Sequence, residues 1–437
     1  MDFKAKAITP GKLTRSLAAF ANADGGELMI GITEGPTDDL TWDGFANEEA
    51  ANGHIQCFDS VFALGHGFSL AFLKARGSPG LVLHVLIQKT RDVKRATDGI
   101  PYIRRGAQNL PVTVPDALRN LERTKGVISF EDEKVSTARV LDVSNSQPIL
   151  GFMLEVIPNS EPEAWLRKQQ LLIGDGPTVA GVLLFTEEPQ VFLPKAAVKI
   201  YRYSSSEREG TRDTLVFAPI AIEGPLYDLV SKSVSRTVEL AEQTKIVTDD
   251  GLRAIQYPHE SLHEIITNAL LHRDYALNDD VHVRIFDNRI EVESPGRLPA
   301  HITPSNILEE RFARNPKVVR IINKFPNPPN KDVGEGLNTA FHAMKKLRLR
   351  EPQITERENS VLVTLLHERL ASPEQQLIEF TRKNGTINNA QARSTTGIES
   401  ELKARGLLQK LVRVGELERI PETARGTTAY RMPLGKR

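Results

Sequence analysis

Residues 258–299 constrain the fold most, because an amphipathic helix pattern directly precedes a β-hairpin pattern and a Pro-Gly turn. One face of the predicted helix is apolar, with the spacing of a 3.6-residue period: Leu262, Ile265, Ile266, Ala269 and Leu270. The opposite face is polar and carries Ser261, Glu264, Asn268 and His272. Pro258 suits the first turn, where its missing N–H is no loss. We therefore predict a helix with one face on a core and one polar face.

The hairpin follows at once. VHVRIF and RIEVES alternate apolar and polar residues, which predicts two half-buried strands joined by a turn at 287–289. Ser294-Pro295-Gly296 then interrupts the alternation. A polar helix face alone is usually a solvated surface, but a glycine-containing polar loop beside a Glu/Asn-bearing helix favours a binding site.

Five motifs in this part of the chain resemble those of the GHKL-like ATP-binding domain, related to gyrase, MutL and histidine-kinase ATPases. They are Glu264-x-x-x-Asn268-Ala269, His272-Arg273-Asp274-Tyr275, Ser294-Pro295-Gly296-Arg297-Leu298-Pro299, Arg314-Asn315-Pro316 and Gly334-Glu335-Gly336-Leu337. More narrowly, they are similar to the variant in bacterial proteins described as transcriptional regulators. Those proteins carry a Schlafen-type AlbA domain in front and a winged helix behind.

The resemblance implies ATP and Mg²⁺ as ligands and assigns roles to single residues. Asn268 would ligate Mg²⁺, which prefers oxygen ligands, and Glu264 would be the catalytic group that polarises the attacking water. Gly334 and Gly336 would let backbone N–H groups approach the phosphates. The remaining cofactor-binding candidates are His272, Arg273, Asp274, Gly296 and Arg314.

One departure concerns the base. The wider family uses an Asp before the turn to accept a hydrogen bond from the adenine amino group, and Val292 occupies that place, with Glu291 and Glu293 alongside. The choice of ATP over other nucleotides therefore stays open. The segment 324–331, where the family forms its ATP lid, is short and proline-rich.

Length and composition limit the number of domains and the class of protein. A chain of 437 residues is expected to form about two or three domains. Its 56 basic and 56 acidic residues balance, so any basic surface is local. The single cysteine, Cys57, excludes an intramolecular disulfide and a cysteine zinc cluster, and we expect it to be a small buried residue. No apolar run has the length of a membrane span and no signal peptide is recognisable, so a cytoplasmic protein without membrane contact is expected.

Residues 1–115 predict an α/β module, with a helix in LTRSLAAFANA and strands in ELMIGIT, LVLHVLIQ and PYIRRG. Three motifs resemble the Schlafen-type AlbA domain: Asp2-Phe3-Lys4, Ala19-Phe20-Ala21-Asn22-x-x-Gly25-Gly26 and PYIRRG. Some members are RNA nucleases with three metal-holding carboxylates. Asp2 and Glu34 match two of these, and the third would precede Asp2, so we expect vestigial carboxylates and a nucleic-acid-binding or assembly module. The candidate phosphate contacts are Lys4, Lys6, Arg104 and Arg105, although surface cations are more often merely solvated.

Residues 116–250 predict a connecting α/β region without a catalytic constellation. The patterns indicate a helix in DALRNLER, two apolar strands in PTVAGVLLFTEEPQVFLPKAAVKIYRY, a strand in TLVFAPI and a long helix in PLYDLVSKSVSRTVELAEQ. The GHKL-like domain would follow at 251–368, with a soft boundary near 250.

Residues 372–437 predict three helices followed by a hairpin, which is the element order of a winged helix. The segment carries 12 Lys or Arg against 7 Asp or Glu, a difference of +5. The helix from Glu399, which includes Arg405, would enter the DNA major groove, and Arg425 in the wing would touch the backbone. The alternative is a dimerisation or docking module, which Glu399 and Glu401 favour because carboxylates repel phosphate.

The resulting fold class is α/β (α+β multidomain), with an AlbA module, a GHKL-like sandwich and a winged helix. The favoured function is an ATP-binding, DNA-binding transcriptional regulator whose nucleotide occupancy modulates nucleic-acid binding. The alternative is an ATPase effector of a bacterial defence system with an RNA- or DNA-processing AlbA module. DNA is favoured over RNA, and a homodimer is expected because related ATPases dimerise and winged helices read paired half-sites.

Overall fold

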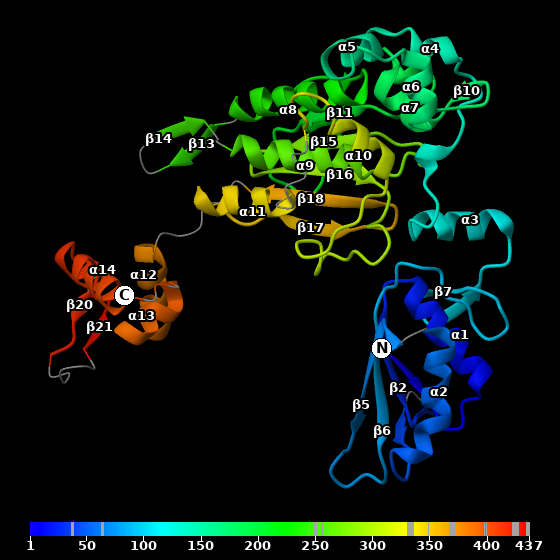
Figure 1. The fold of residues 1–437 in the computed structure, drawn as a ribbon. Helices are drawn as coiled ribbons and strands as arrows, with labels where there is room; N and C mark the ends of the chain where they lie inside the picture. The colour runs from blue at the N-terminus through cyan, green and yellow to red at the C-terminus, as the bar shows by residue number, and fades with distance from the viewer. Residues whose placement is uncertain are drawn as a thin grey trace. The chain divides into compact units, whose positions relative to one another are not determined.

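The computed structural model describes residues 1–35, 39–62, 65–243, 245–248, 251–254, 257–329, 336–347, 349–366, 373–396, 398, 400–421 and 428–433. The chain divides into two compact units, one of Met1–Lys346 with Glu351–His367 and one of Leu347–Arg350 with Glu368–Arg437. The architecture is mixed α/β, as predicted (Figure 1). Across the described ranges, no helix combines the length and apolar character that a membrane crossing needs.

The N-terminal part of the first unit is a four-stranded sheet with helices on one face (Figure 1). The strand order is β1 (Asp2–Lys4), β2 (Gly26–Ile30), β6 (Val82–Ile87) and β5 (Phe68–Leu73), with β1 parallel to β2 and the other pairs antiparallel. Helices α1 (Pro10–Asn22) and α2 (Asn52–Val61) pack together over its core, which includes the buried Cys57. The helix in LTRSLAAFANA is confirmed, and Pro10 starts it because proline suits the first turn.

The strand predicted from ELMIGIT is interrupted by a bend. Gly31 has a φ of +106°, which few other residues adopt, and the chain leaves the sheet there. The rest of the segment forms β3 (Ile32–Glu34), which pairs with β4 (Leu40–Trp42). The strand in PYIRRG is confirmed as β7 (Tyr102–Arg105), paired with β8 (Gln108–Pro111).

The connecting region is mainly helical. Its helices are α3 (Pro115–Thr124), α4 (Val140–Ser144), α5 (Gln147–Val156), α6 (Pro162–Lys168) and α7 (Val179–Phe185), with a short β9 (Leu172–Ile173) and β10 (Gly176–Pro177) hairpin. Short 3-10 turns lie at Phe130–Asp132, Pro189–Val191 and Arg212–Thr214.

Two strand predictions here are wrong. In TLVFAPI, Thr214 ends a 3-10 turn, Leu215 forms only an isolated bridge, and the strand β12 (Ile220–Ile222) begins at the last residue, because Pro219 has no N–H for a ladder bond.

Residues 179–185, also predicted as a strand, form helix α7. Every residue of α7 is buried, so the segment shows neither a 3.6- nor a 2-residue period, and an uninterrupted apolar run does not separate a buried strand from a buried helix. Thr178 starts the helix by accepting a hydrogen bond from the Gly181 N–H at 3.2 Å.

The central sheet has six strands and carries the predicted hairpin. The order is β12 (Ile220–Ile222), β11 (Val198–Arg202), β15 (Val281–Ile285), β16 (Arg289–Pro295), β18 (Ser360–Leu366) and β17 (Gln353–Glu356). Only β11 and β15 run parallel among these pairs. Helices α8 (Leu226–Glu242), α9 (His259–Leu271) and α11 (Gly336–Lys346) lie on one side of it, with α10 (Pro316–Ile322) nearby (Figure 1). A hairpin of β13 (Lys245–Thr248) and β14 (Gly251–Ala254) links α8 to α9.

The predicted helix and hairpin of residues 258–299 are confirmed as α9 and β15–β16. Two details differ. Arg289 is the first residue of β16, so the turn lies one residue earlier than predicted, and the Phe286 N–H donates to the Arg289 carbonyl. The strand also continues through Pro295, and the chain breaks away only at Gly296, where φ is +102°.

The second unit has its own small core. Its elements are α12 (Pro373–Asn384), β19 (Thr386–Asn388), α13 (Asn389–Thr396), α14 (Glu401–Arg413), β20 (Glu418–Arg419) and β21 (Ala429–Arg431), and the sheet order is β19-β21-β20. The three predicted helices are present, whereas β19 was not predicted. The assignment of these elements to a winged helix stays a prediction. Glu399 and Arg425 lie outside the described residues.

Candidate nucleotide-binding site

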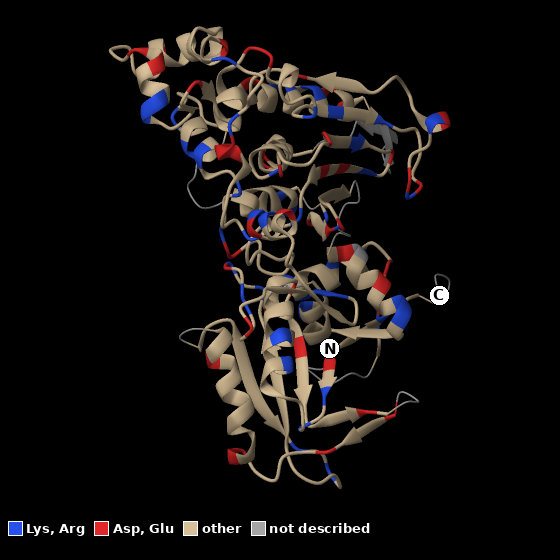
Figure 2. Cartoon of the chain, turned by 90° about the vertical axis from the view of Figure 1, so that its right-hand side faces the viewer, with Lys and Arg blue, Asp and Glu red and all other residues tan. Residues whose placement is uncertain are grey.

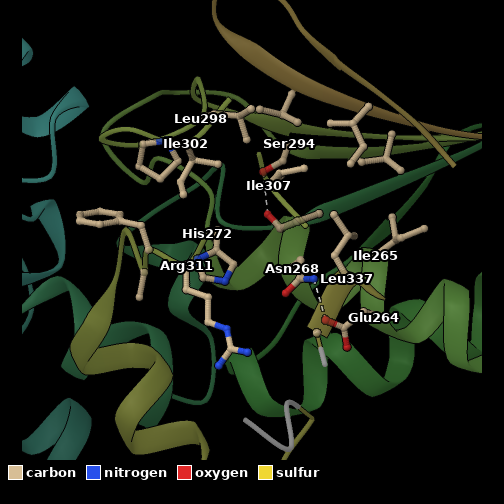
Figure 3. Close-up of a pocket in the computed structure, with 18 of the residues that line it drawn as sticks. Glu264, Ile265, Asn268, His272, Ser294, Leu298, Ile302, Ile307, Arg311 and Leu337 are labelled. Atoms are coloured by element: carbon tan, nitrogen blue, oxygen red, sulfur yellow. Dashed lines mark hydrogen bonds between the residues drawn. The ribbon is translucent and has the colours of Figure 1, made fainter. Parts of the chain in front are cut away.

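A cavity of about 290 Å³ lies between α9, the adjacent face of β16, β18 and β17, and the segment 296–313 (Figure 3). Its wall is mostly apolar. Its polar side chains come from α9 and its C-terminal end, from β16, from the segment 296–313 and from α11: Glu264, Asn268, His272, Ser294, Arg297, Glu310, Arg311 and Asn338. Concave, mainly apolar cavities with a few polar groups are the usual form of small-molecule sites.

Glu264 and Asn268 lie one turn apart on α9 and face the cavity together, as predicted from their spacing (Figure 3). The Asn268 Nδ2 donates to the Glu264 Oε1 at 2.7 Å. This bond leaves the Asn268 Oδ1 as an oxygen ligand for a cation. Burial raises the pKa of Glu264, and the hydrogen bond from Asn268 offsets part of that effect.

Helix α11 approaches the same end of the cavity. It begins at Gly336, so the first N–H groups of the helix, which have no partners within it, lie beside Glu264. A β-carbon on Gly336 would lie 3.6 Å from the Glu264 Oε1. Gly334, the other predicted glycine, lies outside the described residues.

The sheet wall is set by the register of β16. Val292 and Ser294 line the cavity, whereas Glu291 and Glu293 alternate with them and point to the opposite face. Glu291 accepts from Arg289, and Glu293 accepts from Ser360 at 2.6 Å, among other donors. Neither carboxylate therefore faces the cavity.

The imidazole of His272 lines the cavity and is neutral. Burial and the nearby Arg314 cation lower the pKa of its imidazole to about 4, so the ring is uncharged at neutral pH. Its Nδ1 is buried and makes no hydrogen bond to any described residue. The imidazole therefore adds no net charge to the cavity wall.

Three predicted cofactor-binding residues do not line this cavity. The Arg273 side chain is buried and donates to the carbonyls of Lys195 at 2.7 Å and Asp279 at 2.6 Å. Arg314 pairs with Asp274 at 3.1 Å. These side chains hold the loops around the site, and their nucleotide contacts stay predictions.

Gly296 and Gly336 provide a matched pair of substitutions. At Gly296 a β-carbon would lie 2.6 Å from the Asp274 Cβ and φ is +102°, so Gly296→Ala is expected to cost about 2–4 kcal/mol of unfolding free energy. At Gly336 the nearest atom would be 3.6 Å away, and Gly336→Ala is expected to stay within about 1 kcal/mol of the wild type. Urea unfolding measures both, and equal stabilities of the two variants would contradict the prediction.

The N-terminal sheet domain holds the cavity wall formed by residues 297–302. The Lys89 Nζ donates to the carbonyls of Leu298 at 3.0 Å and Ile302 at 3.2 Å, and both of these residues line the cavity. The Lys89 side chain is only 4% exposed, and this burial lowers its pKa despite the nearby carboxylates of Asp24 and Glu356.

Arg297, in the same wall, makes further contacts with the N-terminal sheet domain. The Arg297 guanidinium bonds the Asp24 carboxylate at 2.7 Å and the Glu356 carboxylate at 3.1 Å. Glu356 in turn accepts from the Leu298 N–H at 2.9 Å. Asp24 precedes the Gly25-Gly26 pair of the N-terminal signature, so that turn contacts the cavity wall directly.

The residues predicted to contact nucleic acid lie in both units, and several of them pair with carboxylates. Asp2 pairs with both Lys4 at 2.8 Å and Arg104 at 3.1 Å, so part of their charge is already balanced. Arg105 is exposed, and in the second unit Arg405 pairs with Glu401 at 2.9 Å. Lys and Arg are interspersed with Asp and Glu along the chain (Figure 2). Asp2 and Glu34 join no group of three metal-binding side chains within the described residues.

Comparison with known families agrees with the domain types inferred from the motifs. Residues 1–113 match the family model described as "Schlafen, AlbA_2", and residues 278–365 match the one described as "Putative ATP-dependent DNA helicase recG C-terminal". The chain carries a Schlafen AlbA_2 domain and an ATPase-like domain. Helix α9, with Glu264 and Asn268, precedes the second matched range.

Whole-chain similarity is weak. No protein with a curated description matches the chain. A solved structure that it resembles is that of the DIP2311 protein from Corynebacterium diphtheriae, with 18% identity, coverage of 99% of this chain and 79% of that chain, and a TM-score of 0.42.

Proposed function

We propose that this protein is an ATP-binding, nucleic-acid-binding regulator in which nucleotide occupancy of the cavity modulates nucleic-acid binding. The observation that carries this proposal is the bonding of Lys89 and Asp24, both in the AlbA_2 domain, to the loop that walls the cavity. A ligand that moves this loop changes the contacts of the AlbA_2 domain, and such differential contacts couple two sites.

The site fits a magnesium-bound triphosphate. Asn268 offers an oxygen ligand, and the first N–H groups of α11 lie at the same end of the cavity. Mg²⁺ bound there would neutralise phosphate charge. Gly296 shapes the turn beside the site, and His272 bonds the ligand as a neutral group. Arg273, Asp274 and Arg314 act by positioning these loops.

ATP hydrolysis is a second candidate function. Glu264 is a carboxylate held one turn from Asn268, at the end of the cavity where α11 begins, which is the place for a group that polarises water. The protein would then be an ATPase, with the AlbA_2 domain acting on RNA or DNA in a defence system. Phosphate release in the binding samples distinguishes turnover from occupancy alone.

The second unit would supply the DNA contact. Its three helices and three-stranded sheet follow the element order of a winged helix, with α14 as the reading helix. Arg405 and Arg425 are the proposed contacts there, and Lys4, Arg104 and Arg105 are those of the AlbA_2 domain. A homodimer would present two such units to paired half-sites.

The test is the affinity of the full chain for labelled double-stranded DNA and single-stranded RNA, measured by fluorescence anisotropy with and without Mg²⁺–ATP. We expect the nucleotide to change the dissociation constant by at least about fivefold, the lower range of typical allosteric coupling. Deleting residues 372–437 is expected to weaken DNA binding. Unchanged affinity at a nucleotide concentration shown by calorimetry to saturate the cavity would contradict the coupling.

A further inference from the structure

A second cavity, of about 870 Å³, shares the segment 311–313 with the nucleotide cavity. Its other lining residues are Arg91 of the AlbA_2 domain, Arg119 of α3, and residues of the segments 126–134 and 314–316. It therefore lies where the AlbA_2 domain, the connecting region and the ATPase-like domain meet. Its volume is about three times that of the nucleotide cavity, which is about 290 Å³.

Cations outnumber carboxylates in the lining of this cavity, which we call the cationic cleft. Its charged side chains are two carboxylates and five cations: Asp132, Glu133, Arg91, Arg119, Lys134, Arg311 and Arg314. The difference is +3. Arg311 also lines the nucleotide cavity, and without it the difference is +2. Such a concentration of positive charge attracts a polyanion.

The two carboxylates of the cleft are already bonded to cations. Asp132 accepts from the Lys317 Nζ at 2.5 Å. Glu133 pairs with Arg119 at 3.2 Å and also with Arg123. Because Glu133 has two arginine partners, this group of three keeps a net positive charge, and neither carboxylate is left to repel an anion by itself.

The remaining polar residues of the cleft also have partners. Lys134 pairs with Asp175, and Arg314 pairs with Asp274 at 3.1 Å. The Ser129 Oγ donates to the Arg314 carbonyl at 3.0 Å. The pairs of Lys134 and Arg314 add two carboxylates from outside the lining, and Lys317 and Arg123 add two cations, so the surplus of positive charge is unchanged.

Arg91 is the cation of the cleft that is best placed for an added anion. It is exposed and makes no ion pair with any described residue. Its guanidinium carbon lies over the Phe312 ring, 5.1 Å from the ring centre. Stacking on the ring orients the guanidinium, and its N–H groups remain in the guanidinium plane, where they can donate to two oxygens of one phosphate.

We propose that the cationic cleft binds the phosphate backbone of single-stranded nucleic acid, with Arg91 and Arg119 as phosphate contacts. This inference rests on the nucleic-acid binding of the proposed function and places it at a site apart from Lys4, Arg104 and Arg105. A cleft about three times as large as a cavity proposed for one nucleotide has room for several. A single strand can follow such a concave surface, as strands do in basic grooves of other proteins.

A strand bound there contacts the wall of the nucleotide cavity directly. Arg311, Phe312 and Ala313 line both cavities, and Figure 3 shows Arg311 on the nucleotide side. Arg91 follows Lys89 by two residues, so one segment of the AlbA_2 domain both bonds the cavity wall and carries a phosphate contact. The two ligands therefore share one wall.

The experiment is fluorescence anisotropy of the full chain with labelled oligothymidylate and oligouridylate of about ten nucleotides, between about 50 and 200 mM salt. Arg91→Gln is expected to weaken binding of both strands by at least about threefold and to reduce the salt dependence. The slope of log affinity against log salt should fall by about 0.7, the value for one phosphate contact to a single strand. Adding Arg119→Gln should lower the slope again.

Arg95→Gln is the matched control. Arg95 is an exposed arginine four residues after Arg91, it does not line the cleft, and it donates to the Gly99 carbonyl at 3.1 Å. This variant is expected to keep the wild-type affinity and salt slope. An unchanged urea midpoint in Arg91→Gln shows that any loss of affinity does not come from unfolding.

The outcomes separate the cleft from the proposed function. If the wild type binds no nucleic acid, the proposed function fails and the cleft with it. If the wild type binds the strands but Arg91→Gln keeps the affinity and slope, or if Arg91→Gln and Arg95→Gln lose affinity equally, the cleft is overturned and the function stands. If Arg91→Gln loses binding of inorganic tripolyphosphate alone, the cleft takes a small polyphosphate and the proposal is also overturned.

Discussion

Asn268→Ala is expected to weaken Mg²⁺–ATP binding by at least about tenfold, the usual loss when a metal site is disturbed. The substitution removes the proposed oxygen ligand and also the hydrogen bond that holds Glu264. Calorimetric titration of ATP in the presence of Mg²⁺ measures the loss. Chelating Mg²⁺ from the wild type should reduce its affinity toward that of the variant, and the variant should respond less to chelation.

Glu260→Gln is the control for Asn268→Ala. Glu260 lies in the first turn of the same helix and is exposed, so its substitution changes a charge on α9 without touching the cavity. It is expected to bind ATP as the wild type does. Wild-type ATP affinity in Asn268→Ala would contradict the assignment of Asn268, and equal losses in both variants would point to a general effect on α9.

Where hydrophobic periodicity was clear, the sequence predicted the structure. Helix α9 and the β15–β16 hairpin have clean periods of 3.6 and 2 residues, because each has one buried face. Helix α7 was misassigned because it is buried on all sides, which removes the period. The same reasoning placed Glu264 and Asn268 side by side, as the structure shows.

The residues of β16 that line the cavity could be identified only from the register of the sheet. The motif drew attention to Val292 and the two glutamates beside it, but only the pairing of β16 shows that these glutamates face away from the cavity. A period of two from Val292 could have indicated Ser294. The hydrogen bond that the Ser294 Oγ donates to the Ala269 carbonyl could not have been predicted, since Ala269 lies 25 residues earlier in the chain.

Contacts between distant segments carry no local sequence signal. Lys89 and the Leu298 carbonyl are 209 residues apart, and Arg297 and Asp24 are 273 apart. The resemblance assigned Arg273 to nucleotide binding, whereas in the structure its guanidinium donates to backbone carbonyls. A motif indicates where an arginine such as Arg273 lies in the sequence. The acceptors that its N–H groups contact depend on how the whole chain packs.

Lys89→Met is expected to have the largest effect on the contact between the AlbA_2 domain and the cavity wall. Methionine keeps the length of the side chain but has no N–H groups. It would leave the carbonyls of Leu298 and Ile302 without this donor and remove the cation beside Asp24 and Glu356. Burying such unpaired groups should lower the unfolding free energy by about 2–4 kcal/mol, measured by urea denaturation.

The same variant tests the coupling, because Lys89 contacts the loop rather than the proposed ligand positions at Glu264 and Asn268. Lys89→Met should still bind Mg²⁺–ATP, but the effect of the nucleotide on nucleic-acid affinity should fall to less than about twofold. Lys12→Met, at an exposed lysine of α1 in the same domain, should keep both stability and coupling. If Lys89→Met retains the full nucleotide effect, the signal passes through other contacts, and the buried lysine serves only to hold the two domains together.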